Sequence, residues 1–177
     1  MLLAKHCSLI LIAALGAATA VADDSRPFTT AGSTGTVDES DLGIVTLSGP
    51  YVAVSAAAPA GSTADVRYNV IDLQGLHGYD RYIMRVRFLD NGASAHVIVR
   101  LKEYNIATGA TITRMTLDSN AFAPGAAYQT QSVDSGCWPG WSFNFDLNVY
   151  FIEVELQKTG AGGTPSLAAI QIGGSLC

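Results

Sequence analysis

The residues best suited to hold a ligand lie in the stretch CWPGW, residues 137–141, which contains both tryptophans of the chain. Flat aromatic faces in exposed loops stack on sugar rings, and Trp138 and Trp141, with Tyr128 close in sequence, could form such a platform. The alternative is structural, because the Pro-Gly pair between the indoles predicts a turn and tryptophans often pack on disulfides in β-sandwiches. We expect at least one indole to be buried and leave binding by the other open.

Two of the three cysteines, Cys137 and Cys177, lie outside the N-terminal export signal described below. An exported chain with one even pair of cysteines most simply forms one disulfide, because its compartment is oxidising. We therefore predict a bond that ties the last residue of the chain to the tryptophan-rich stretch.

Glu153 and Glu155 are the carboxylates best spaced for acid–base chemistry, since residues two apart on a strand share a face. Cations on neighbouring strands would instead place these acids in a surface ion-pair ladder, which is the favoured interpretation. The expected basic partners are Arg85, Arg87, Arg100 and Lys102. Without its acids this basic stripe would be a polyanion site, which the negative net charge of the chain argues against.

Asp38, Glu39 and Asp41 form the weak calcium candidate, because hard cations prefer carboxylate oxygens. Their spacing does not match an EF-hand loop, and solvated loop acids are the default interpretation. The sequence contains no G-x-S-x-G elbow and no H-E-x-x-H motif. We therefore predict no catalytic residues and no cofactor other than calcium, and we expect a protein that is not an enzyme.

The elements that must position these residues alternate between apolar and polar side chains with a period of two, which is typical of half-buried strands. Residues 81–89 and 95–104 flank the turn sequence DNGAS and predict a hairpin. No long helical stripe occurs in the mature chain, so we predict an all-β, antiparallel two-layer β-sandwich of jelly-roll or Greek-key type with one C-terminal disulfide. The expected strands are 51–56, 65–73, 81–89, 95–104, 108–117, 126–133, 147–158 and 166–174.

The N-terminus predicts an export signal. Residues 1–22 combine a basic head, an apolar run and an A-x-A site, which indicates a signal peptide cleaved after Ala22. Residues 23–43 are rich in Thr, Ser, Gly and acids and predict a flexible polar leader, while 44–177 form a single β-sandwich domain. The mature protein is expected to be secreted or periplasmic and to have no transmembrane segment.

The chain carries 10 Lys and Arg against 15 Asp and Glu, a net charge of −5, which argues against nucleic-acid partners. Its pattern is similar in architecture to secreted jelly-roll domains, including carbohydrate-binding modules. The leading hypothesis is an exported, non-enzymatic protein with a binding role, or a structural role in the cell envelope or outside the cell. Its partner is unknown, and a polysaccharide or another envelope protein is the expected class. A module that stacks sugars on tryptophan, with or without calcium, is one alternative, and a glycoside hydrolase using the two glutamates is another. Self-association through an edge strand stays open.

Overall fold

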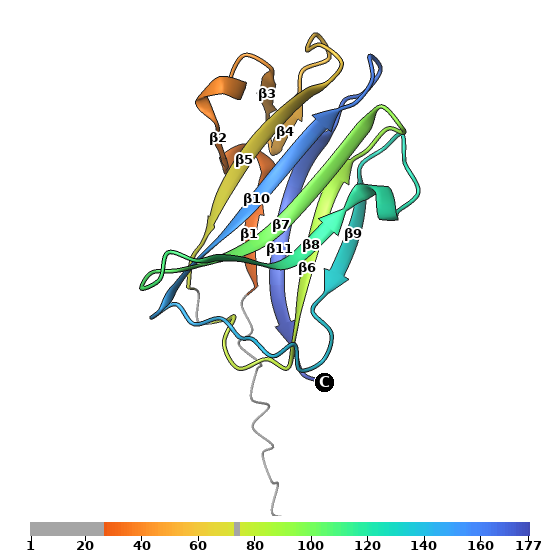
Figure 1. Ribbon diagram of the computed structural model, residues 1–177. Coiled ribbons are helices and arrows are strands. Elements are labelled where there is room, and N and C mark those ends of the chain that lie inside the picture. The colour runs from red at the N-terminus through yellow and green to blue at the C-terminus, as the bar shows by residue number, and fades with distance from the viewer. Residues whose placement is uncertain (1–26, 73–74) are drawn as a thin grey trace, which may run out of the picture.

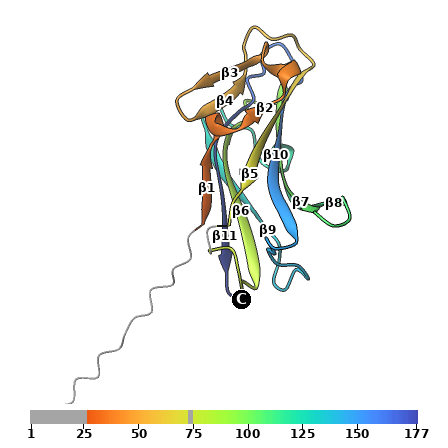
Figure 2. The same cartoon turned by 90° about the vertical axis from the view of Figure 1, so that its left-hand side faces the viewer.

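The protein is an antiparallel β-sandwich of two sheets packed face to face (Figures 1 and 2). The structure, a computed structural model, describes residues 27–72 and 75–177, so the predicted signal peptide lies outside the described residues. The predicted all-β class is confirmed. The strands are β1 Phe28–Ala31, β2 Thr36–Val37, β3 Val45–Ser48, β4 Tyr51–Val54, β5 Ser62–Val70, β6 Arg81–Leu89, β7 Ala95–Asn105, β8 Thr111–Asp118, β9 Gln129–Asp134, β10 Asn148–Lys158 and β11 Ser166–Ser175, with short 3-10 helices η1 Gly32–Thr34, η2 Glu39–Asp41 and η3 Ser119–Ala121.

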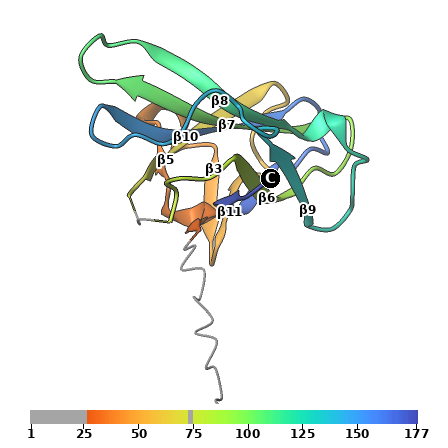
Figure 3. The same cartoon turned by 90° about the horizontal axis from the view of Figure 1, so that it is seen from below.

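The first layer, called sheet A here, has the strand order β3-β4-β11-β6-β9, and β1 also pairs with β11. The second layer, sheet B, has the order β2-β5-β10-β7-β8. Figure 3 shows the two layers from below. Within the described ranges, only β3 with β4 and β7 with β8 are neighbours both in sequence and in a sheet. All other pairings join distant segments, as in Greek-key and jelly-roll sandwiches.

The core lies between the sheets and is built from the alternating apolar rows of the long strands. The inward apolar side chains of β6, β7 and β10 have an exposed fraction of at most 2%, as the sequence pattern predicts. Burying each large aliphatic or aromatic side chain of these rows stabilises the fold by roughly 1.5–3 kcal/mol. The rows are Tyr82, Met84, Val86 and Phe88; Ala95, Val97, Val99 and Leu101; and Tyr150, Ile152, Val154 and Leu156.

The predicted hairpin of 81–89 with 95–104 is wrong. β6 pairs with β11 and β9 in sheet A, whereas β7 pairs with β10 and β8 in sheet B. The connection therefore crosses from one layer to the other. Asp90 fixes this crossing, because its buried carboxylate accepts hydrogen bonds from the hydroxyl of Ser119 and the amide of Gly92. The turn residues of DNGAS serve the crossing just as well as a hairpin, so local sequence could not separate the two.

The segment 27–43 is built into the sandwich, which differs from the flexible leader expected over residues 23–43. β1 pairs antiparallel with β11, and its Phe28 side chain is 5% exposed and part of the core. Gly32 lies so close to β11 that an added Cβ would meet the carbonyl oxygen of Leu167 at 2.1 Å. The carbonyl of Gly32 accepts a 2.6 Å hydrogen bond from the Tyr68 hydroxyl. One apolar side chain, Phe28, and backbone pairing are enough to hold this segment on the sandwich, and the composition of the segment does not reveal them.

No helix in the described ranges is long and apolar enough to cross a membrane.

Candidate functional site

The predicted disulfide is confirmed and joins Cys137 to Cys177, with their Cα atoms 6.0 Å apart. It ties the end of the chain, just after β11, to the loop between β9 and β10, at the end of the sandwich marked C in Figure 1. The amide of Trp138 also donates a 2.7 Å hydrogen bond to the carbonyl of Asp80. The loop that carries the tryptophans is thus held to two other segments of the chain.

Trp141 closes this end of the core. Its ring stacks on Tyr82 with centroids 4.8 Å apart and meets Phe143 edge-on at 5.6 Å. The guanidinium of Arg114, from sheet B, lies 5.5 Å from the indole centroid, within cation–π distance. This indole has a structural role.

Arg114 is itself fixed by Glu103, which is only 7% exposed. The two side chains form two hydrogen bonds of 2.8 Å in a fork, the strongest geometry for this pair. These hydrogen bonds raise the pKa of Arg114, so the cation next to Trp141 keeps its charge. The sequence pattern did not predict this pair, because its only signal was a charged residue on the inward side of β7.

Trp138 differs from Trp141 in both exposure and backbone. Its side chain is 73% exposed, and its φ of 56° is the only positive value at a non-glycine residue in the described ranges. A positive φ costs a bulky L-residue roughly 1–2 kcal/mol. The surrounding contacts, including the disulfide, hold the residue in this conformation.

A shallow hollow lies beside Trp138, and we call it the Trp138 hollow. The Asp80 carboxylate is part of its wall and accepts a 3.3 Å hydrogen bond from the amide of Cys177. Tyr79 packs directly over Gly174, where an added Cβ would overlap the ring at 1.8 Å. The hollow is lined by Tyr79, Asp80, Trp138, Pro139, Gly140, Trp141 and Ser142.

Tyr128, the third predicted binding residue, lies away from the tryptophans. It precedes β9, whereas the tryptophans follow that strand. Its ring stacks on Tyr51 with centroids 4.6 Å apart, and its hydroxyl lies 2.6 Å from the Ser166 hydroxyl. The predicted group is therefore split between two places on the molecule.

The outer face of sheet B carries an ion-pair ladder. Arg100 bridges both glutamates, at 3.3 Å from Glu153 and 2.9 Å from Glu155, and Lys102 contacts Glu153 at 2.7 Å. The predicted partners Arg85 and Arg87 are not part of it, because β6 belongs to sheet A and its polar side faces away from sheet B. This part of the prediction is wrong for the same reason as the hairpin: β6 and β7 lie in different sheets.

The ladder extends beyond the glutamates through hydrogen bonds. Gln157 donates to Glu155, and one ring nitrogen of His96 lies 3.0 Å from the side-chain oxygen of Gln157. The other ring nitrogen lies 2.7 Å from the carboxylate of Asp118. Burial opposes ionisation of Asp118, but its hydrogen bonds with His96 and the Asn120 amide lower its pKa. The row is a connected polar network.

This network disfavours glycoside hydrolysis by Glu153 and Glu155. A general acid in such an enzyme needs a raised pKa. Burial raises the pKa of Glu155, but its hydrogen bonds with Gln157 and Arg100 outweigh burial and lower it. Both carboxylates are engaged by the same guanidinium, so neither is free to protonate a leaving group.

The acids that lie together near the predicted calcium site differ from the predicted set. One carboxylate oxygen each of Asp38, Asp41 and Asp65 lie within 4.8 Å of one another, and Glu39 does not belong to the group. Burial, followed by repulsion from Glu155, Asp41 and Asp38, raises the pKa of Asp65. Asp38 accepts a hydrogen bond from Arg67 at 3.1 Å, and Asp41 accepts one from the Asp65 amide at 2.9 Å. These contacts account for the cluster without an ion.

Comparisons with solved structures find distant likenesses. The CBM36-1 domain of a multidomain xylanase from the hindgut metagenome of Trinervitermes trinervoides is 14% identical, with a TM-score of 0.49, covering 86% of this chain and 100% of that one. The xylan-binding module CBM15 is 12% identical, with a TM-score of 0.42 and coverages of 75% and 82%. A carbohydrate-binding module of Cellvibrio mixtus lichenase 5A, in complex with cellotriose, is 13% identical, with a TM-score of 0.40 and coverages of 84% and 97%. No protein-family model and no curated protein sequence matches the chain. Likenesses this distant carry no argument about ligand or activity, which must come from the residues of this chain.

Proposed function

We propose that this chain is an exported, non-enzymatic binding protein that recognises a polysaccharide through the Trp138 hollow. The observation that carries the proposal is the indole of Trp138, which is 73% exposed and held at a positive φ. Either feature alone is unfavourable, and strained backbone persists where the surrounding structure enforces it, often at binding sites. A bare aromatic face fixed in this way suits stacking on a sugar ring.

The hollow supplies polar groups next to the aromatic face. Asp80 is a hydrogen-bond acceptor for sugar hydroxyls, and Tyr79 adds a phenol that can donate or accept. Small-molecule sites typically combine apolar walls with a few polar groups of this kind.

The rigidity of the corner favours binding. The disulfide, the bond from the Trp138 amide to Asp80 and the packing of Trp141 under the loop fix its conformation before any ligand arrives. A preorganised loop loses less conformational entropy on binding.

Export is supported by the disulfide, because such bonds persist in oxidising compartments. The predicted signal peptide over residues 1–22 is consistent with this proposal. Together they support a secreted or periplasmic location.

The test uses the mature, oxidised chain and its intrinsic fluorescence. We expect acrylamide to quench one indole readily and a panel of neutral polysaccharides to include one that shifts the emission of that indole. Trp138→Ala should abolish this binding while Trp141 still reports a native core. Leu147→Ala is the matched control, since this apolar side chain is also largely exposed, at 57%, but lies outside the hollow. Unchanged binding by Trp138→Ala, or no neutral polysaccharide bound by the native protein, would refute the proposal.

A further inference from the structure

The outer face of sheet A holds an unusual group of cations. Eight Lys and Arg residues lie in the described ranges. Four of them pair with carboxylates, and Lys158 is buried against backbone carbonyls. The other three, Arg81, Arg85 and Arg87, share one side of β6 and have no ion pair within the part of the chain that the structure describes. We call the surface around them the arginine face.

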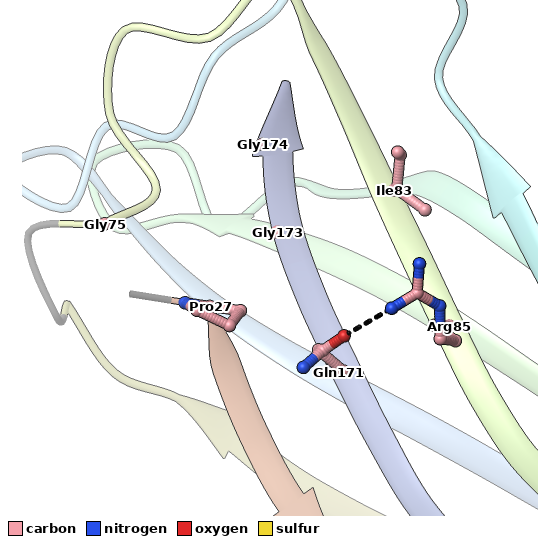
Figure 4. A pocket seen from close by; sticks show the side chains of 7 residues that line it. All are labelled: Pro27, Gly75, Ile83, Arg85, Gln171, Gly173 and Gly174. Carbon is pink, nitrogen blue, oxygen red and sulfur yellow. Dashed lines mark hydrogen bonds between the residues drawn. The ribbon is translucent and has the colours of Figure 1, made fainter. Parts of the chain in front are cut away.

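Within the described ranges, the side-chain hydrogen bonds of these three arginines all go to neutral side chains. Arg85 donates a 2.9 Å hydrogen bond to Gln171, drawn in Figure 4, and Arg87 donates one of 3.3 Å to Thr130. Arg81 donates to the Ser175 hydroxyl at 3.3 Å. A guanidinium has five N–H donors, so these contacts orient the cations and leave donors of the exposed Arg85 and Arg87 free for a ligand, whereas the Nε of Arg81 is buried.

A groove runs beside the arginines over β11. The outward positions of this strand include Gly173, which faces Ile83 across the pairing with β6, so no long side chain fills the space there. Figure 4 shows Gly173 and Gly174 between Pro27 on one side and Arg85 on the other. The row from Arg81 to Arg87 extends for about 20 Å at the usual rise of a strand.

The far end of the arginine face carries two aromatic rings. Tyr128 and Tyr51 stack on each other, and the guanidinium of Arg87 lies 5.9 Å from the ring of Tyr128. The neighbouring strand β9 carries one acidic residue, Asp134, which is paired with Ile83 and not with an arginine. Its carboxylate accepts a 2.8 Å hydrogen bond from the amide of Gly136. The face is therefore positive, polar and long, on a protein whose net charge is −5.

We propose that the arginine face binds a polysaccharide whose sugar units carry carboxylates. Guanidinium groups bind carboxylates in a fork, and the Thr, Ser and Gln side chains between them can hydrogen-bond to sugar hydroxyls. The negative charge of the rest of the protein repels a densely charged polymer such as a nucleic acid, but less so a chain with one charge per sugar. The groove shares no lining residue with the Trp138 hollow, although Tyr79 of the hollow packs over Gly174 of the groove, and this inference does not rest on the function proposed for the hollow.

Binding is measured by titration calorimetry with polygalacturonate and alginate as carboxylated probes, neutral xylan as the uncharged probe, and oligo(dT) and dextran sulfate as other polyanions. We expect at least one carboxylated probe to bind, and its affinity to fall as salt rises. The double variant Arg85→Gln/Arg87→Gln should weaken this binding about tenfold or more, because two charge-assisted contacts are lost. Arg67→Gln is the matched control, because Arg67 is an exposed arginine of sheet B. The thermal unfolding of both variants is measured to check that each is folded.

Three results would overturn the inference. The first is a double variant that is folded and binds as the native protein does. The second is tighter binding of oligo(dT) or dextran sulfate than of both carboxylated probes, and the third is no binding of either carboxylated probe. Trp138→Ala separates this inference from the proposed function. If that variant loses the carboxylated probe while the arginine variant keeps it, the ligand belongs to the hollow and only the arginine face is refuted.

Discussion

Replacing both cysteines of the disulfide, Cys137→Ser with Cys177→Ser, should lower the free energy of unfolding by about 4 kcal/mol. The bond closes a loop with a sequence separation of 40. A loop of that length removes about 13 cal/mol/K of entropy from the unfolded chain, or about 4 kcal/mol at room temperature. For a domain of this size the melting temperature should fall by about 10 °C.

The native structure should survive this change, because other contacts hold both ends of the bond. Ser175, just before Cys177, pairs with Arg81 at the end of β11. The amide of Ser135 donates to Tyr82, and that of Trp138 donates to Asp80. The loss therefore arises mainly in the unfolded state, and the packed environment of Trp141 should be unchanged.

Urea unfolding, followed by far-ultraviolet circular dichroism and by fluorescence, measures the effect. The variant should show a lower midpoint and a larger m-value, since its unfolded chain is more expanded. Reduction of the native protein should reproduce both changes. A loss below about 1 kcal/mol would refute the loop-closure reasoning, and a variant already unfolded in buffer would show that the bond is needed for the native packing itself.

Three smaller changes test other parts of the structure. Arg100→Met should destabilise the fold by about 1–2 kcal/mol near neutral pH, measured by urea unfolding, because Glu155 loses its cation and Glu153 keeps only Lys102. The lowered pKa values of Glu155 and Asp118 stabilise the native protein above their ordinary values of 4.5 and 3.8, and this stabilisation is lost as pH falls through the lowered values; a flat stability profile between pH 5 and pH 2 would contradict this. Asp65 has a raised pKa, so Asp65→Asn in chelator should stabilise the protein at pH 7 by less than about 1 kcal/mol, and the gain should vanish below pH 3.8.

The sequence predicts the strands of this fold better than their partners. The inward rows of β6, β7 and β10 follow from a period of two, because a residue on the core side must be apolar whichever strand lies beside it. The pairing of β6 with β11 and β9 depends on which layer each strand enters. That choice is made by contacts such as the buried carboxylate of Asp90 with Ser119, which are far apart in sequence.

The candidate sites show the same division. The disulfide follows from the number of cysteines. The spacing of the two tryptophans does not show which of them packs on the core and which is exposed. Which indole is exposed depends on the conformation of one residue, Trp138, and on the position of Tyr82 in another strand. The arginine face could not be predicted because the acids expected to neutralise Arg85 and Arg87 belong to the opposite sheet.

The central position of β11 in sheet A has a kinetic consequence. β1, β4 and β6 all pair with β11, the strand of this sandwich that lies furthest along the sequence, so none of these pairings can form until β11 has been synthesised. Pairings between segments so distant in sequence are slow to form, because the entropy of closing long loops is lost before any contact is gained. Sheet A therefore stays incomplete while the strands before β11 are synthesised, although the local pairs β3 with β4 and β7 with β8 can form earlier. That delay would favour the export proposed above, in which the chain crosses a membrane before it folds.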